Sequence, residues 1–346
     1  MRPRRSFPKQ LLLLALSAAS ASFAGAQTVG GSAVYNFLHL PASPALSAAG
    51  GVNVSYAAPD AGLAANNPAL LRPALHGQLG LNFNAFFAGT RAYQLAGAFH
   101  VAKWNTTFGS SLFYIDHGSL AQTDATGYET GSFRPRDMSF QLSAARSYGK
   151  RWHYGLTAKV IRSSYGSYGS TGLAFDLGLH YQDTARHFSA GLLAKNMGGQ
   201  LSRFGSQGED LPFDLQVGIT QRLAKSPFGF SLTLQQLHRF HIGYNDTTFN
   251  NETGFTNKSS FATKLFNHVV LGTHVFLSRN LEATIGYNFL RRSDLNVGST
   301  GNGLNGFSAG FTARFSRLQV QYARAYYQRG RAYNQFGIQL ALQRKI

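Results

Sequence analysis

The stretch that decides the fold is WHYGLTAKV, residues 152–160, which is followed after a polar break by GLAFDLGLHY, residues 172–181. Large or apolar side chains occupy every second position in both segments. Small or polar residues such as Gly155, Thr157 and Gly178 lie between them. Alternation with a period of two residues predicts β-strands that have one apolar face and one polar face.

The same alternation recurs along the rest of the chain in segments of about ten residues. A tilted strand needs about 9–11 residues to cross a bilayer, whereas ordinary strands average about five or six. A soluble β-sandwich would also alternate, but the strand length favours an all-β fold, a transmembrane antiparallel β-barrel of about fourteen strands. The predicted strands are 77–88, 92–103, 106–115, 136–146, 152–162, 170–181, 187–196, 212–222, 228–238, 266–277, 281–290, 306–316, 318–326 and 331–343.

The connections between these strands alternate in length. Short turns are followed by longer polar segments, above all 116–135, 197–211, 239–265 and 291–305. Outer-membrane barrels have short periplasmic turns and longer outside loops, and an even strand number returns both ends of the barrel to the periplasm. Loops 116–135 and 239–265 are the candidates for partner contact because of their length. Aromatic residues at strand ends predict an interfacial girdle: Trp104, Trp152, Tyr181, Phe228, Tyr287, Phe289, Phe315 and Tyr333.

Residues 1–26 have the pattern of a signal peptide. A basic region from Arg2 to Lys9 precedes a short apolar run, and Ala24-Gly25-Ala26 forms an A-x-A cleavage site. The apolar run is too short to span a bilayer as a helix, although an uncleaved anchor is the alternative interpretation. We therefore expect export to the outer membrane of a Gram-negative bacterium, with the mature chain beginning at Gln27.

The composition also indicates a membrane barrel. The chain contains 38 Gly, 28 Phe and 16 Tyr but no Cys, and charged residues make up 13%. A soluble domain has about 25% charged residues, so the surface of this chain is poor in charge. The formal net charge is +18, which favours anionic lipid or an acidic partner and, for an exported chain, argues against nucleic acid.

Residues 27–76 fit neither a helix nor a strand. The run NFLHLPASPALSAAGGVNVSYAAPDAGLAANNPALL (36–71) is apolar but is interrupted by Pro, Gly and Asn. Irregular backbone at membrane depth is tolerated only where it is buried in protein or lines a cavity. We therefore expect 27–76 to plug a barrel formed by 77–346, with a plug motif that consists of Pro41, Gly50, Gly51, Asn66, Asn67, Pro68 and Ala69.

No pattern in the sequence predicts catalysis, a cofactor or a metal ion. The run 301–306 matches G-x-G-x-x-G, but a strand follows it, whereas a dinucleotide site needs a helix there. His238 and His241 have H-x-x-H spacing, with His268 and His274 downstream; without a nearby carboxylate cluster, solvated or interfacial histidines are favoured over a metal site. The protein is predicted not to be an enzyme.

Basic residues lie near several of the short turns. Anchoring at lipid phosphates is favoured for them over the docking of a periplasmic partner. These residues are Lys103, Arg146, Lys150, Arg151, Arg186, Arg222, Lys225, Arg279 and Arg317.

Several runs of the chain resemble a known family. The runs 36–43, 50–55, 66–71, 76–79, 211–214 and 230–234 resemble the PorV/PorQ family, outer-membrane barrels of the type IX secretion system. The element Asn67-Pro68-Ala69 also resembles the plug of FadL-type long-chain fatty acid transporters, which have fourteen strands and an N-terminal hatch. The resemblance implies a place in an attachment complex with the barrel PorV, the sortase-like PorU and the surface protein PorZ, which links cargo to anionic lipopolysaccharide.

Three functions are therefore compatible with the sequence. The leading hypothesis is a non-enzymatic anchor that docks the PorZ-like protein and PorU at the cell surface. The alternative is a FadL-like transporter that passes a hydrophobic small molecule across the outer membrane. The polar and small residues on the inward strand positions favour the anchor over the transporter. A soluble exported adhesin is a third hypothesis.

Overall fold

The computed structural model describes residues 33–86, 89–243, 260–295, 303–328 and 331–342. The predicted signal peptide, residues 244–259 of the predicted contact loop 239–265, and the first residues of the 301–306 motif lie outside the described residues. No helix of the described part of the chain is long and apolar enough to cross a membrane.

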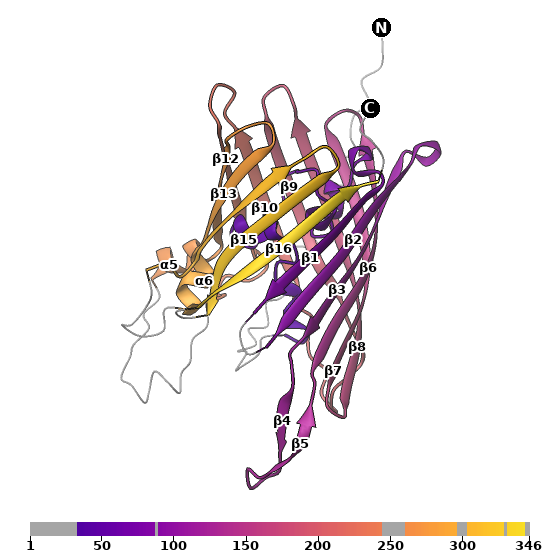
Figure 1. Cartoon of the computed structure of the whole chain (residues 1–346), viewed down its shortest axis with the longest axis vertical. Helices are drawn as coiled ribbons and strands as arrows, with labels where there is room; N and C mark the ends of the chain where they lie inside the picture. Colours follow the sequence, from indigo (N-terminus) through magenta and orange to yellow (C-terminus); the bar gives the residue numbers. More distant parts are fainter. Residues whose placement is uncertain (1–32, 87–88, 244–259, 296–302, 329–330, 343–346) are drawn as a thin grey trace, which may run out of the picture. The chain divides into compact units, whose positions relative to one another are not determined.

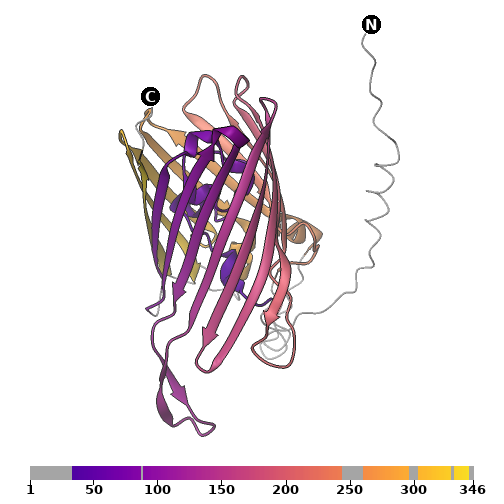
Figure 2. The ribbon, with the colours of Figure 1, turned by 90° about the vertical axis from the view of Figure 1, so that its right-hand side faces the viewer.

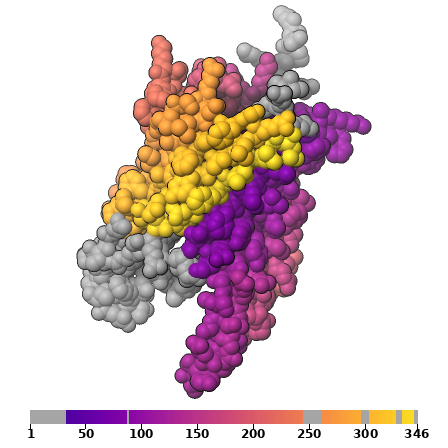
Figure 3. Space-filling view, in the orientation of Figure 1, coloured from indigo at the N-terminus to yellow at the C-terminus, as the bar shows by residue number. Residues whose placement is uncertain are grey.

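Fourteen antiparallel strands form a closed barrel (Figure 1), which confirms the predicted fold class. The barrel closes where β1 pairs with β16, from Gln78 opposite Ala341 to Ala85 opposite Asn334. Figure 3 shows this junction as a continuous surface on which the last strand adjoins the first. The strands are β1 (Gln78–Ala85), β2 (Arg91–Val101), β3 (Thr106–Asp116), β6 (Arg136–Tyr148), β7 (Trp152–Tyr165), β8 (Tyr168–Asp183), β9 (Phe188–Ser202), β10 (Asp214–Arg222), β11 (Phe228–Leu234), β12 (Val269–Phe276), β13 (Leu281–Asn288), β14 (Phe307–Arg314), β15 (Leu318–Gln328) and β16 (Arg331–Ala341).

The two faces of the strands differ as the alternation predicts. Outward side chains are apolar and exposed, as for Leu81 at 55% and Ile338 at 50%. Inward side chains such as Asn82, Gln94 and Gln339 are polar and at most 2% exposed. An apolar exterior around a polar interior is the arrangement of membrane barrels. Tyr333 departs from the predicted girdle because it faces inward, where its hydroxyl lies 3.3 Å from Ser47 Oγ.

Residues 33–77 lie inside the barrel as a chain of short helical turns (Figure 2). Prolines begin three of these turns, and a proline at the first helical position lacks only an N–H that would have no helical partner. Gly50 and Gly51 follow the end of α2 with φ of 96° and 88°, a conformation that favours glycine. The turns are η2 (Asn36–His39), α2 (Pro44–Ala48), α3 (Ala61–Ala64), η3 (Pro68–Leu70) and η4 (Pro73–Leu75).

The hydrophobic core lies between this plug and the barrel wall. In one cluster Leu46, Leu63 and Leu75 of the plug pack against Ala96 of β2 and Ala145 of β6. A second cluster, near the long loops, joins plug residues 34–38 to inward residues of the wall such as Phe113, Ile115 and Ile161. The barrel interior is therefore filled by its own N-terminal segment.

The long connections contain structure that the sequence did not predict. The loop between β3 and β6 forms a hairpin of β4 (Leu120–Thr123) and β5 (Glu129–Phe133), which extends beyond the barrel (Figure 1). A strand predicted to begin at 266 begins instead at Val269, because α5 (Phe261–Asn267) precedes it and is capped by Ser260 Oγ, 3.1 Å from Thr263 N. A second helix, α6 (Phe289–Leu295), follows β13, and η5 (Ala102–Trp104) forms the β2–β3 turn.

Candidate functional site: the plug and its seat in the barrel

Inward glycines let the backbone of the plug approach the wall closely. A Cβ atom at Gly155 of β7 would lie 2.6 Å from the carbonyl carbon of Pro68, and one at Gly178 of β8 would lie 3.1 Å from Cβ of Ala69. At Gly191 of β9 a Cβ atom would lie 2.8 Å from the carbonyl carbon of Val54. Only glycine leaves room for backbone at these distances. We call this part of the interior the glycine wall.

Four of the seven predicted plug-motif residues lie together on the glycine wall. Asn67 is fully buried; its Oδ1 accepts from Ala69 N at 3.0 Å, which caps η3, and its Nδ2 donates to Val54 O at 2.9 Å. Asn66 Oδ1 accepts from Lys195 Nζ of β9 at 2.7 Å. The run from Asn66 to Ala69 is therefore held by cap bonds within the plug and by contacts with β7, β8 and β9.

The other three plug-motif residues lie apart from this run, and their contacts differ. The carbonyl of Pro41 accepts from Gln335 Nε2 of β16 at 3.0 Å. The carbonyl of Gly50 accepts from Arg291 Nη2 at 2.8 Å, and Gly51 N donates to Leu46 O at 2.9 Å, within the plug. The seven residues thus make up separate seating contacts rather than one binding site.

Sequence reasoning missed the residues that hold the centre of the plug. Ser55 Oγ lies 2.8 Å from Thr220 Oγ1 of β10, and Ser55 O accepts from His180 Nε2 at 3.0 Å. No sequence pattern connects these residues, because the partners lie more than 100 positions apart.

A buried charged cluster holds the next residue of the plug. The Tyr56 hydroxyl donates to Glu282 of β13, and the Tyr56 ring stacks on His274 of β12 with centroids 4.0 Å apart. Arg314 Nη2 of β14 lies 2.6 Å from Glu282 Oε2 and balances its charge. Tyr56 therefore also holds the plug against the wall, through contacts with β12 and β13.

Asp60 holds α3 against the seam where the barrel closes. It is fully buried, its Oδ1 accepts from Gly62 N and Leu63 N, and its Oδ2 accepts from Gln321 Nε2 of β15 at 2.9 Å. Burial raises the pKa of Asp60 above its usual 3.8, although the hydrogen bonds from Gln321, Leu63 and Gly62 oppose that rise. An amide side chain of the wall, that of Gln321, thus holds this part of the plug.

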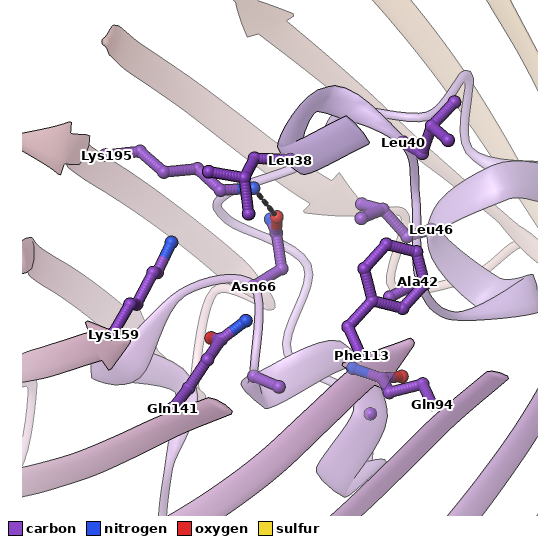
Figure 4. A pocket seen from close by; sticks show the side chains of 12 residues that line it. Leu38, Leu40, Ala42, Leu46, Asn66, Gln94, Phe113, Gln141, Lys159 and Lys195 are labelled. Atoms are coloured by element: carbon purple, nitrogen blue, oxygen red, sulfur yellow. Dashed lines mark hydrogen bonds between the residues drawn. The ribbon is translucent and has the colours of Figure 1, made fainter. Parts of the chain in front are cut away.

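A small cavity lies between the plug and the wall (Figure 4). Its apolar lining comes mainly from the plug, at Leu38, Leu40, Ala42 and Leu46, with Phe113 of β3 opposite. Its volume is about 30 Å³, which is space for about two water molecules. A larger molecule fits there only if the plug moves.

The polar side of this cavity contains two lysines. Lys159 and Asp176 are at most 1% exposed and form an ion pair at 2.7 Å, and Lys159 Nζ also donates to Asn196 Oδ1 at 2.8 Å. Lys195 points toward Asn66 of the plug in Figure 4. Lys195 therefore connects the plug to the wall, whereas Lys159 is balanced within the wall.

The predicted histidines of the described residues do not form a metal site. His268 and His274 are 5% and 1% exposed, so the expectation that they are solvated or interfacial was wrong. They are buried because His268 Nδ1 bonds to Gln235 O at 2.8 Å and His274 stacks on Tyr56. His238 packs against Phe213, and His241 Nε2 lies 2.8 Å from Lys264 Nζ. Within the described ranges no three potential metal ligands come together.

The structural role of the inward glycines differs from the one predicted from the sequence. They were taken as small residues of a polar lumen, but they form the seat of the plug. Their recurrence on the inward positions of successive strands, as at Gly155, Gly178 and Gly191, was the available signal.

Solved structures of other proteins share the fold of this chain. No family model matches the chain, and no curated protein sequence matches it significantly. The fold is similar to that of the CymD monoaromatic hydrocarbon channel, with a TM-score of 0.54 and 14% identity over 89% of this chain and 97% of that one. A mutant of the TodX monoaromatic hydrocarbon channel gives 0.54 and 14% over 87% and 98%. The Pseudomonas putida toluene transporter TodX gives 0.51 and 14% over 85% and 95%.

Proposed function

We propose that this protein is an outer-membrane channel that admits small hydrophobic molecules, with residues 33–77 as its gate. The observation that carries the proposal is that the plug, not the wall, supplies most of the apolar surface of the cavity. The inward strand positions are mainly polar or glycine, so the alternation of the strands cannot reveal an apolar path formed by the plug. The structural neighbours named as hydrocarbon channels support the same substrate class.

In this proposal the plug must move before a solute can pass. The cavity of about 30 Å³ is far smaller than the roughly 300–1,000 Å³ of sites for drug-sized ligands. A ligand that competes for the apolar surfaces of Leu38 and Leu46 would favour the displaced plug. The chain has no catalytic task in this proposal: it binds, releases and excludes water. The short turns face the periplasm, as in other membrane barrels.

A disulfide that locks the plug tests the proposal. Ser55 Oγ and Thr220 Oγ1 lie 2.8 Å apart, so S55C/T220C can form a bond between the plug and β10 in a chain without other cysteines. Ser143 Oγ and Thr157 Oγ1 are also 2.8 Å apart but join two wall strands, β6 and β7. S143C/T157C is therefore a matched control that leaves the plug free.

The assay is the initial rate of uptake of radiolabelled toluene, and separately of a long-chain fatty acid, into vesicles that contain the purified protein and lipopolysaccharide, which slows the unassisted diffusion of apolar solutes. Oxidised S55C/T220C should stop uptake, reductant should restore it, and S143C/T157C should transport in both states. Wild-type uptake no faster than in empty vesicles would refute transport. Continued uptake through oxidised S55C/T220C would refute the gate.

Docking of cell-surface partners is a second candidate function, favoured by the β4–β5 hairpin. Both of its strands are solvent-exposed, and Tyr128 between them is 74% exposed. The hairpin fits the prediction of a partner contact at 116–135 and the attachment-complex function with a PorZ-like protein, PorU and PorV. Co-purification of a sortase-like protease and a large surface protein with the wild type, but not with a chain lacking 118–134, would support docking. Equal recovery with both chains, or with neither, would refute it.

A further inference from the structure

The six short turns at one end of the barrel are uniformly basic. Each contains at least one Lys or Arg, and none contains Asp or Glu. These turns lie together at the upper end of Figures 1 and 2. Their residues are 102–105, 149–151, 184–187, 223–227, 277–280 and 315–317. We call this end the short-turn rim.

The opposite end of the barrel does not share this property. There, acidic residues interrupt the basic ones: Asp124 and Glu129 lie in the connection from β3 to β6, Glu209 and Asp210 in that from β9 to β10, and Asp294 in α6. The positive charge of the chain is therefore unopposed at only one of the two ends.

The basic side chains of the short-turn rim are exposed to a ligand. The two acidic residues nearest the rim are buried, and of the two only Asp183 contacts a rim cation. Asp183 pairs with Arg151 at 3.5 Å, and Glu282 faces the lumen, where it pairs with Arg314. Nine basic residues at the rim are exposed: Lys103, Arg146, Lys150, Arg151, Arg186, Arg222, Lys225, Arg279 and Arg317.

The rim adjoins the lipid-facing belt of the barrel. Trp104, Tyr148, Trp152 and Phe315 lie in or beside the short turns and are 56%, 76%, 44% and 63% exposed. Exposed aromatic residues at strand ends mark the level of lipid headgroups. The basic side chains thus lie at or just beyond that level, within reach of lipid phosphates.

We propose that the short-turn rim binds the phosphate headgroups of anionic phospholipids in the adjacent leaflet. The distribution of charge favours lipid over an acidic protein, because a docked protein covers one arc of a barrel whereas lipid surrounds it. All six turns carry a cation, so the rim matches a ring of lipid. Each Lys or Arg near an anionic surface contributes about 1 kcal/mol, which is about a fivefold preference. This binding site is independent of the proposed transport.

Native mass spectrometry of the full chain in neutral detergent tests the proposal, with equal amounts of phosphatidylglycerol and phosphatidylcholine as probes. K150Q/R186Q/R279Q removes three rim charges. R162Q/R203Q/R324Q removes three exposed charges near the opposite end and is the matched control. Heat-modifiable migration on gels verifies that both variants keep a folded barrel.

The wild type should prefer phosphatidylglycerol about fivefold per contacting cation, less so at high salt because the charges are exposed. K150Q/R186Q/R279Q should bind clearly less phosphatidylglycerol, because three of the nine exposed rim cations are removed, and R162Q/R203Q/R324Q should keep the wild-type preference. The proposal is overturned if the wild type does not distinguish the lipids, which would fit an acidic protein partner instead. It is also overturned if the rim variant keeps its preference or the control loses as much.

Discussion

The seating of the plug depends on glycines that face each other on neighbouring strands. Gly155 of β7 and Gly178 of β8 are direct cross-strand partners, and both contact the plug at residues 67–69. G155A adds a methyl group 2.6–2.8 Å from three atoms of Pro68. Because non-bonded carbon atoms normally meet at about 3.5–4.0 Å, the plug must retreat by about 1 Å.

The expected cost follows from this overlap. Overpacking costs about 1–3 kcal/mol at one site, and two neighbouring sites do not add fully. We therefore expect G155A/G178A to weaken seating by about 2–4 kcal/mol, which raises the unseated population at least about thirtyfold. The strand hydrogen bonds of the barrel are unaffected, so the barrel itself should remain folded.

A buried cysteine in the plug reports its exposure. Ala64 is 1% exposed and the chain contains no cysteine, so maleimide labelling of A64C is specific. Labelling should accelerate at least about thirtyfold in G155A/G178A, in line with the population shift. The control is G199A, because a Cβ atom at Gly199 meets nothing within 4 Å. Equal labelling rates in G155A/G178A and G199A would refute the role of the glycines.

Three further predictions concern the plug, the wall and the hairpin. Burial raises the pKa of Asp60 above 3.8 in the seated plug, so seating takes up a proton and is favoured as the pH falls toward 3.8. Labelling of A64C, normalised to unfolded protein at each pH, should therefore slow on acidification. In the D60N background the labelling rate should not change with pH. D176N leaves Lys159 buried without its counter-ion and should lower the free energy of unfolding in urea by about 3–5 kcal/mol. K159M/D176L should recover most of this loss, and the exposed-site variant D124N should change the free energy of unfolding little. Replacing 118–134 with a short turn should leave toluene uptake unchanged, because the hairpin lies beyond the barrel strands; lost uptake in a folded barrel would contradict this.

The sequence by itself determined the barrel. Strand alternation is a local property with a period of two, so 152–160 and 172–181 could be identified without knowledge of their neighbours. The alternation of short and long connections then set the topology, because antiparallel neighbours need only short turns. Periodicity did not predict the elements of the long loops, because the sequences of β4, β5 and α5 have no strong periodic pattern.

Only the tertiary structure decided what the inward face does. In the sequence, Gly155 and Gly178 are two of many small residues. The structure shows that Pro68 and Ala69 of the plug lie directly against them. The bond between Tyr56 and Glu282 joins positions 226 residues apart. Such contacts depend on how the barrel closes around the plug, and no short-range pattern encodes that closure. The strands could therefore be predicted one by one, whereas the seat of the plug exists only when all fourteen come together.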